Sequence, residues 1–249
     1  MNMHVKSRLG SYLTLIAIAL VIPVQLAAQE ESVKPGINKS FEDPDVPRFI
    51  GLFEREGRDA FDHRHEIVAA CDLQPGMEIA DVGAGTGLFT RMFAGEVGVD
   101  GKVYAVDISE KFLKHIEESL EDEQLTNVVP VLCTQDSVNL PPESVDIVFI
   151  CDTYHHFEFP FKTMRTVHSA LRKGGVVVLV DFERIEGKSA PFIMGHVRAG
   201  KEVFTKEIHE SGFRQVEEKE GMLDESYFIR FEKIDRPDTP ETAPDDVDE

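Results

Sequence analysis

The segment that most constrains the fold runs from Glu78 to Arg91 and reads EIADVGAGTGLFTR. Its first residues alternate between apolar and polar character, which is typical of a strand, and its last residues predict a helix. Between the two stand Gly83, Gly85 and Gly87. Glycine adopts positive φ and lets a ligand approach the backbone, because it carries no Cβ. A strand, a glycine-rich turn and a helix in this order predict a ligand crevice at the carboxyl end of an α/β sheet.

Strands and helices are predicted to alternate through the rest of the chain. The apolar runs at 144–152 and 174–182 are nearly continuous, as in strands that are covered on both faces. Further strands are predicted at 101–108, 127–133, 214–220 and 226–233, and helices at 58–73, 88–97, 110–122, 161–175 and 201–213. The fourth of these helices is expected to end at Gly174, with Arg172 and Lys173 in its last turn. This alternation predicts an open, mainly parallel α/β sheet.

The two ends of the chain differ in composition from its middle. Residues 1–28 combine a basic start, an apolar run and small residues before an expected cleavage after Ala28, which is the pattern of a secretory signal peptide. We therefore predict an exported, periplasmic protein without stable membrane insertion after cleavage. Because the apolar run is short beside the roughly 20 residues of a membrane span, an anchor that stays uncleaved is the alternative. Residues 29–58 are expected to form a linker or cap, residues 59–233 the folded domain, and residues 234–249 a disordered acidic tail.

Charge and cysteine content narrow the possible partners. The formal net charge is −20 at pH 7. Such acidity opposes the approach to phosphates, so nucleic acid and anionic membranes are not expected as partners. Cys71, Cys133 and Cys151 are far apart, form no CxxC pair, and are expected to be buried free thiols. His63 and His65 are two residues apart and point to different faces of a helix, so we predict no metal site.

Two kinds of ligand compete for the glycine turn. A dinucleotide places its pyrophosphate at the helix N-terminus and favours the spacing GxGxxG. Here the spacing is GxGxG, and Asp81 precedes Gly83 by two residues, where its carboxylate would repel a diphosphate. A ligand that carries a cationic ammonium group suits this turn better. A dinucleotide-binding oxidoreductase remains an alternative.

Further motifs follow the glycine turn in chain order. Asp107 ends the segment VYAVDI, Asp136 lies in TQDSVNLP, and the segments DIVFICDTYHHF, LRKGGVVVLVDF and ESGF come after them. Together with DVGAGTG at 81–87, these segments resemble the motifs of class I S-adenosylmethionine-dependent methyltransferases over about residues 60–232. The resemblance implies a Rossmann-like, seven-stranded, mostly parallel sheet with helices on both faces and a reversed last strand. It also implies S-adenosylmethionine (SAM) as the cofactor.

The resemblance assigns roles within the site. Asp107 is expected to accept hydrogen bonds from both ribose hydroxyls of SAM, and Asp136 to bind the adenine amino group. The expected cofactor-binding residues are Asp81, Gly83, Ala84, Gly85, Thr86, Gly87, Asp107, Ile108, Asp136, Ser137 and Asp152.

Methyl transfer from a sulfonium is a direct displacement, so the protein mainly has to position the acceptor. A general base is needed only where the acceptor must lose a proton. The catalytic candidates are His155 and His156, whose ordinary pKa lies near neutrality, and Asp152 beside them. A packing role for the two histidines is the alternative. His196 is expected to be a surface or packing residue, and the segment 61–66 to contribute to a lid over the SAM pocket.

The acceptor itself is not specified by any motif. The segment 183–200 is a short insertion, which indicates a small, rather exposed site that residues 29–58 help to frame. The predicted function is therefore methyl transfer from SAM to an unidentified small-molecule acceptor. A non-catalytic module that binds a nucleoside or SAM is the alternative. The oligomeric state is not predicted.

Overall fold

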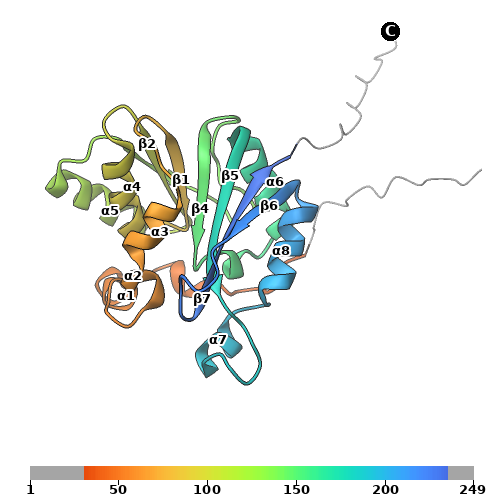
Figure 1. Cartoon of the computed structure of the whole chain (residues 1–249). Helices are drawn as coiled ribbons and strands as arrows, with labels where there is room; N and C mark the ends of the chain where they lie inside the picture. The colour runs from red at the N-terminus through yellow and green to blue at the C-terminus, as the bar shows by residue number, and fades with distance from the viewer. Residues whose placement is uncertain (1–30, 235–249) are drawn as a thin grey trace, which may run out of the picture.

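The computed structural model describes residues 31–234, so the predicted signal peptide and nearly all of the predicted acidic tail lie outside the described residues. Seven strands form one sheet in the order β3-β2-β1-β4-β5-β7-β6 (Figure 1). Their bounds are β1 Glu78–Val82, β2 Lys102–Asp107, β3 Val128–Leu132, β4 Val145–Cys151, β5 Leu171–Phe182, β6 Phe213–Glu218 and β7 Ser226–Lys233. The strands β1 to β5 pair in parallel, and β7 runs antiparallel to both β5 and β6. The predicted sheet with a reversed last strand is confirmed.

Helices cover both faces of the sheet (Figure 1). Their bounds are α3 Arg64–Ala70, α4 Leu88–Val97, α5 Glu110–Glu123, α6 Pro160–Ala170 and α8 Lys201–Glu210. The side chains of α3 and α4 pack on one face, and those of α6 and α8 pack on the other. On the first face, Phe149 of β4 is fully buried and its ring centroid lies 4.9 Å from those of both Phe89 and Phe93. Truncating a buried phenylalanine to alanine lowers the free energy of unfolding by about 3–5 kcal/mol. The centre of the sheet is therefore tightly packed, and it supports the loops at its carboxyl edge.

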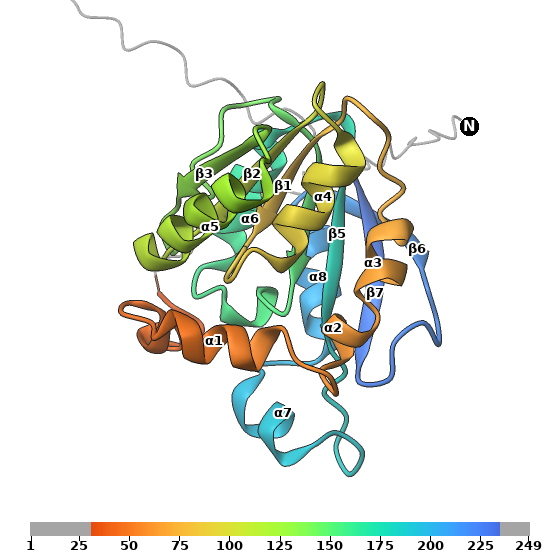
Figure 2. The same ribbon diagram turned by 90° about the vertical axis from the view of Figure 1, so that its left-hand side faces the viewer.

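Short elements lie beyond the carboxyl ends of the parallel strands (Figure 2). They are the 3₁₀ helices η1 Lys39–Phe41 and η2 Tyr154–His156 and the helices α1 Val46–Phe53, α2 Asp59–Asp62 and α7 Pro191–His196. The N-terminal part of the described chain is fastened to the loop after β4. The backbone N–H groups of Val33 and Gly36 donate to Glu158, and Asn38 Nδ2 donates to His156 O at 3.1 Å. Residues 31–58 therefore form a cap over this edge; we call them the N-terminal cap.

The predicted helix 201–213 ends at Glu210, and two other predicted helices differ more from the structure. The predicted helix 58–73 is split into α2 and α3 at His63. The carboxylate of Asp59 accepts hydrogen bonds from the backbone of the β6–β7 connection, whereas Ile67 and Val68 pack under the sheet, so the two pieces are held by different neighbours.

The second difference lies before β5. The predicted helix 161–175 ends at Ala170, and Gly174 belongs to β5. Leu171 is fully buried and pairs with Val145 of β4, which requires extended backbone at Leu171. Arg172 therefore leaves the helix and makes ion pairs of 2.9 Å with both Glu78 and Asp146.

Membrane insertion can be judged for the described part of the chain. Between residues 31 and 234, no helix combines the length and the apolar character that crossing a bilayer requires.

Candidate functional site

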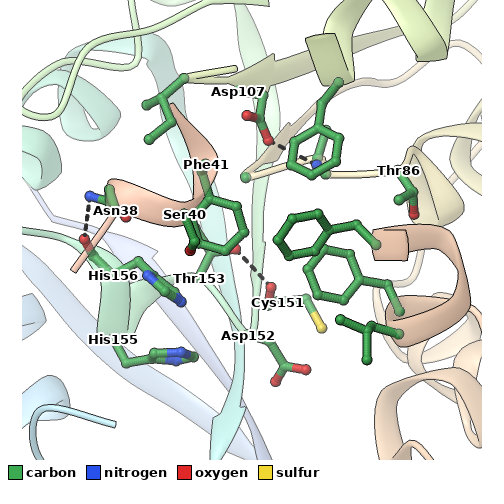
Figure 3. Close-up of a pocket in the computed structure, with 18 of the residues that line it drawn as sticks. Asn38, Ser40, Phe41, Thr86, Asp107, Cys151, Asp152, Thr153, His155 and His156 are labelled. Atoms are coloured by element: carbon green, nitrogen blue, oxygen red, sulfur yellow. Dashed lines mark hydrogen bonds between the residues drawn. The ribbon is translucent and has the colours of Figure 1, made fainter. Parts of the chain in front are cut away.

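A cavity of about 860 Å³ opens at the carboxyl ends of β1, β2 and β4, beneath α1 and α7. Asp107 lies at one end of it, and His155 lies at the other (Figure 3). The volume falls near the upper end of the roughly 300–1,000 Å³ of small-molecule sites, so a nucleoside cofactor and a second small molecule both fit. The site is larger than the short insertion 183–200 led us to expect, because the N-terminal cap forms a wall as well.

The glycine turn requires glycine for two reasons, a left-handed backbone conformation and close packing against the neighbouring loop. Gly83 has φ of 78°, and Gly87, which caps α4, has φ of 82°. A Cβ on Gly83 would lie 2.3 Å from the side chain of Thr153 in the neighbouring loop. The backbone N–H groups of Gly83 and Ala84 donate to Val106 O of β2, at 2.8 and 3.1 Å. The turn is therefore held against both neighbouring strands, and its backbone faces the cavity.

Asp107 is positioned by backbone hydrogen bonds at the bottom of the cavity. Gly85 N donates to Oδ2 at 2.9 Å, and Ser109 N donates to Oδ1 at 2.8 Å. Burial raises the pKa of Asp107 to about 6, although these backbone N–H groups lower it. Each carboxylate oxygen keeps a second lone pair, so the group can still accept hydrogen bonds from a vicinal diol.

Asp81 lies beneath the turn and is almost fully buried. Its Oδ2 accepts a hydrogen bond from Thr90 Oγ1 at 2.6 Å. Burial raises the pKa of Asp81 to about 7, the bond from Thr90 lowers it, and the negative charge of Asp107 raises it further. A ligand with a positive charge would favour the ionised form of this carboxyl group.

The loop after β3 contributes part of the cavity lining. Ser137 lines the cavity, as does Ile108 after β2, but Asp136 does not. The carboxylate of Asp136 accepts a hydrogen bond from Thr134 Oγ1 at 2.8 Å and lies 3.9 Å from Lys162 Nζ. Its side chain is 46% exposed, and its contact with the adenine amino group stays a prediction. The other predicted cofactor-binding residues that line the cavity are Asp81, Gly83, Ala84, Gly85, Thr86, Asp107 and Asp152.

Asp152 ends β4 in a left-handed conformation, with φ of 48°. Its Oδ2 accepts a hydrogen bond of 2.7 Å from the guanidinium of Arg58, which also donates to Phe53 O at 2.7 Å. Burial raises the pKa of Asp152, and the charge of Arg58 opposes this rise. Arg58 therefore ties the end of α1 to the end of β4, a role that no sequence motif indicated.

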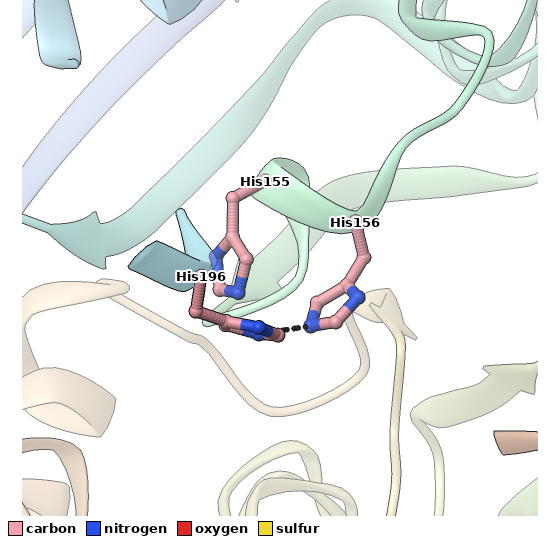
Figure 4. Close-up of side chains that lie close together, drawn as sticks. All are labelled: His155, His156 and His196. Atoms are coloured by element: carbon pink, nitrogen blue, oxygen red, sulfur yellow. Dashed lines mark hydrogen bonds between the residues drawn. The ribbon is translucent and has the colours of Figure 1, made fainter. Parts of the chain in front are cut away.

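Three histidines meet at the other end of the cavity (Figure 4). His155 is buried, and its Nδ1 lies 2.7 Å from Oδ1 of Asp181 at the end of β5. Nε2 of His156 lies 3.1 Å from Nε2 of His196 on α7. Burial, followed by the charges of its neighbours, lowers the pKa of His156 to about 2, and burial likewise lowers that of His196 to about 4.

The pKa shifts and contacts of these histidines distinguish the two candidates for the general base. A ring with a pKa as low as that of His156 is a weak proton acceptor at neutral pH, so His155, oriented by Asp181, is the better candidate of the two. The catalytic roles of His155, His156 and Asp152 stay predictions. His196, which was expected on the surface or in packing, instead lines the cavity.

The N-terminal cap supplies an aromatic wall. The ring of Phe49 lies 5.3 Å from that of Phe41, 5.2 Å from that of Phe53 and 5.4 Å from that of Phe112 on α5. Phe41 also packs edge-on against His156, with 5.1 Å between the ring centroids. The helical spacing of Phe49 and Phe53 could have indicated an apolar face within a segment that its prolines and acids suggested was a linker.

Comparison with known proteins finds similarity over the same region. The family model of a methyltransferase domain matches residues 80–179, from β1 into β5. The ubiquinone/menaquinone biosynthesis C-methyltransferase UbiE of Bordetella avium is 25% identical over 125 residues, which are 50% of this chain and 48% of that protein. Its namesake from Burkholderia cenocepacia is 26% identical over 119 residues, 47% of this chain and 48% of that protein. The chain thus spans about half the length of the curated relatives it matches.

Solved structures share the fold. A SAM-dependent methyltransferase from Aquifex aeolicus superimposes with a TM-score of 0.68 at 22% identity, covering 77% of this chain and all of that one. Phosphoethanolamine N-methyltransferase 2 of Haemonchus contortus, solved with SAM, gives a TM-score of 0.62 at 17% identity, covering 82% of this chain and 60% of that one. The [4+2]-cyclase SpnF gives 0.61 at 15% identity, covering 73% and 85%. The comparisons confirm the class I methyltransferase fold, and the match to a methyltransferase domain supports SAM as cofactor. The cyclase shows that this fold also carries other chemistry.

Proposed function

We propose that this protein transfers a methyl group from SAM to a small, largely apolar acceptor that binds between the glycine turn and the three histidines. The observation that carries the proposal is the placement of Asp107. Its carboxylate is fixed by two backbone N–H groups at the bottom of a cavity, beside a turn whose glycines leave the backbone open to a ligand. The methyltransferase-domain match over residues 80–179 supports the same reaction.

The character of the walls supports the choice of acceptor. Phe41, Phe49 and Phe53 face the cavity from the cap, and Phe192 and Ile193 face it from α7. Apolar walls with few polar groups select ligands with an apolar ring or chain. The matched relatives are named for ubiquinone and menaquinone biosynthesis, whose products are quinones, and this agrees with such an acceptor.

The test begins with the cofactor. Isothermal calorimetry with S-adenosylhomocysteine (SAH), the product of methyl transfer, should show one site per chain, and NADH should give no binding heat. Asp107→Ala should lose SAH binding, because the ribose hydroxyls lose both acceptor oxygens. Asp100→Ala, at an exposed carboxylate outside the cavity lining, is the control and should bind SAH as the native chain does.

Catalysis needs a separate measurement. The native chain should incorporate radiolabelled methyl groups from SAM into a small-molecule extract, and Asp107→Ala should not. Binding of SAH without any methyl incorporation would favour a non-catalytic SAM-binding module instead. Tight binding of NADH with indifference to SAH would overturn the proposal in favour of a dinucleotide enzyme.

Location is a second part of the proposal. The composition of residues 1–28 supports export with cleavage after Ala28, and an uncleaved anchor is the alternative. Mass spectrometry of the protein recovered from its native membrane and soluble fractions tests this. A mature chain that begins at Gln29 supports export with cleavage, and an intact N-terminus in the soluble fraction contradicts it.

A further inference from the structure

We propose that His155, His156 and His196 form a binding site for a first-row divalent metal ion, with zinc as the representative ion. No sequence motif indicated it, because two of the ligands lie on η2 and the third lies about forty residues later on α7. The proposal goes beyond methyl transfer, since metal binding by these rings does not depend on SAM.

The geometry of the three rings carries the proposal. One nitrogen of each ring lies within 4.8 Å of the corresponding nitrogens of the other two. Two imidazole nitrogens bound to one tetrahedral zinc at about 2.0–2.1 Å are about 3.3 Å apart. The 3.1 Å between Nε2 of His156 and Nε2 of His196 is close to that separation. The His155 nitrogen needs to move by no more than about 1.5 Å to complete the set.

A carboxylate contacts the ring of His155, the first of the three proposed ligands. Oδ1 of Asp181 lies 2.7 Å from Nδ1 of His155, which leaves Nε2 of that ring for the metal. This carboxylate–histidine arrangement is the usual support of a metal-binding imidazole, because it fixes the tautomer and the ring orientation. Asp181 is itself fully buried and receives the backbone N–H groups of His155 and Phe182.

Of the charged groups near the three histidines, one opposes a bound cation and one favours it. Lys34, whose ammonium donates to His196 O at 2.7 Å, opposes a cation at the cluster. Asp181 offsets it at closer range, since its carboxylate contacts the first ligand directly. Three imidazoles without a thiolate suit zinc, copper, iron or nickel rather than magnesium or calcium, which prefer oxygen ligands.

The open coordination position of the proposed metal ion indicates which donor atom an acceptor would need. All three rings line the cavity, so a three-histidine metal keeps its fourth position toward the bound acceptor. That position suits an acceptor with a hydroxyl, thiol or carboxyl donor atom. This step, unlike metal binding itself, rests on the proposed function.

The experiment uses the full chain without an affinity tag, freed of metal with EDTA and titrated with zinc sulfate by calorimetry. Cobalt chloride, followed by visible absorption, is the parallel titration. The native protein should bind one equivalent of each, and azide should change the cobalt spectrum by entering the fourth position. His196→Gln and His155→Gln should each weaken zinc by more than about 100-fold, and Asp181→Asn by about 10- to 100-fold.

Two control variants identify the site. His65→Gln removes an exposed histidine and should leave zinc affinity unchanged. His63→Gln disrupts the separate group of Asp59, His63 and Asp224, which could also hold an ion. Failure of the native chain to bind stoichiometric zinc, or equal zinc affinity in the native chain and His196→Gln, overturns the proposal. The proposal is also overturned if His63→Gln loses zinc binding while His155→Gln and His196→Gln keep it. SAH calorimetry on every variant checks folding and reports separately on the proposed function.

Discussion

The two ends of the cavity are built in different ways. At the cofactor end, the glycine turn and Asp107 come from β1, β2 and the loops that follow them directly, within about thirty residues of chain. At the acceptor end, the walls come from the N-terminal cap, the loop after β4 and α7, which lie far apart in the sequence. At the first end, backbone hydrogen bonds fix Asp107, whereas at the second end contacts between side chains of distant segments join Arg58 to Asp152 and His156 to His196.

This difference predicts unequal sensitivity to substitution. A local, backbone-bonded site fails when its backbone conformation changes, because no neighbouring side chain can compensate. An assembled site loosens when one of the contacts between segments is lost, and the rest of the protein stays folded. The three substitutions or conditions below run from the largest expected effect on cofactor binding to the smallest.

Gly83→Ala should abolish SAH binding. The residue has φ of 78°, and its new Cβ would meet both Cγ2 and Oγ1 of Thr153 at 2.3 Å, so rotating Thr153 only exchanges one clash for another. The left-handed conformation costs about 1–2 kcal/mol and the crowding about 1–3 kcal/mol. Calorimetry with SAH and urea unfolding measure the two effects.

Gly174→Ala is the matched control. Gly174 has φ of 75°, but a Cβ there meets nothing within 4 Å, so the substitution carries the conformational cost alone. It should lower the free energy of unfolding by about 1–2 kcal/mol and leave SAH binding intact. Equal behaviour of the two variants would show that contact with Thr153 does not matter to the turn.

Acid should weaken SAH binding without unfolding the protein. Because burial raises the pKa of Asp107 to about 6, its carboxyl group is ionised at pH 8 and mostly protonated at pH 5. If the ribose hydroxyls bind the ionised form, the apparent affinity falls by about tenfold between pH 7 and pH 5. Calorimetry across this range should show the fall in the native chain and in Asp81→Asn, but not in Asp107→Asn. A pH dependence that disappears in Asp81→Asn would assign the proton to the other carboxyl group.

The cofactor end could be predicted from the sequence because its signals are local. The glycine spacing, Asp81 and Asp107 are each read from short segments. The structure brings Gly83, Gly85 and both carboxylates to one cavity, whereas Gly87 caps α4 outside the lining. The role of Asp136 stays a prediction, because its carboxylate is held by Thr134 and lies near Lys162 beside the cavity rather than in its lining. The end of α6 was missed because the buried pairing of Leu171 with Val145 overrides the helical character of the segment.

The acceptor end could not be predicted, because its contacts join segments that no local pattern connects. The contact between His156 and His196 spans forty positions, and the bond from Arg58 to Asp152 spans ninety-four. Residues 29–58 were expected to be a linker or cap that helps to frame the acceptor site, and residues between 38 and 58 line the cavity, but their aromatic contacts were not predicted. Residue types alone indicate the chemistry of such groups, but only the tertiary fold decides which of them meet.

Glu158→Ala should loosen the acceptor end and leave the cofactor end unchanged. Glu158 Oε2 accepts a hydrogen bond of 2.6 Å from Ser32 Oγ, and Oε1 accepts one of 3.0 Å from Gly36 N, so one buried carboxylate holds the start of the N-terminal cap. Hydrogen bonds to a charged group contribute about 1.5–3 kcal/mol each. Losing about 2 kcal/mol of local stability raises amide exchange in the cap about 30-fold.

Hydrogen exchange of residues 31–45 and SAH calorimetry on the same samples separate the two ends. Glu158→Gln is the control, since its amide oxygen retains one acceptor, and exchange in this variant should lie between the native chain and Glu158→Ala. SAH affinity should be the same in all three, because the hydrogen bonds described above for Asp107 and the glycine turn run to one another, to Ser109 and to β2. If Glu158→Ala weakens SAH as strongly as Asp107→Ala, the cap is part of the cofactor site, and the two ends of the cavity act as one unit.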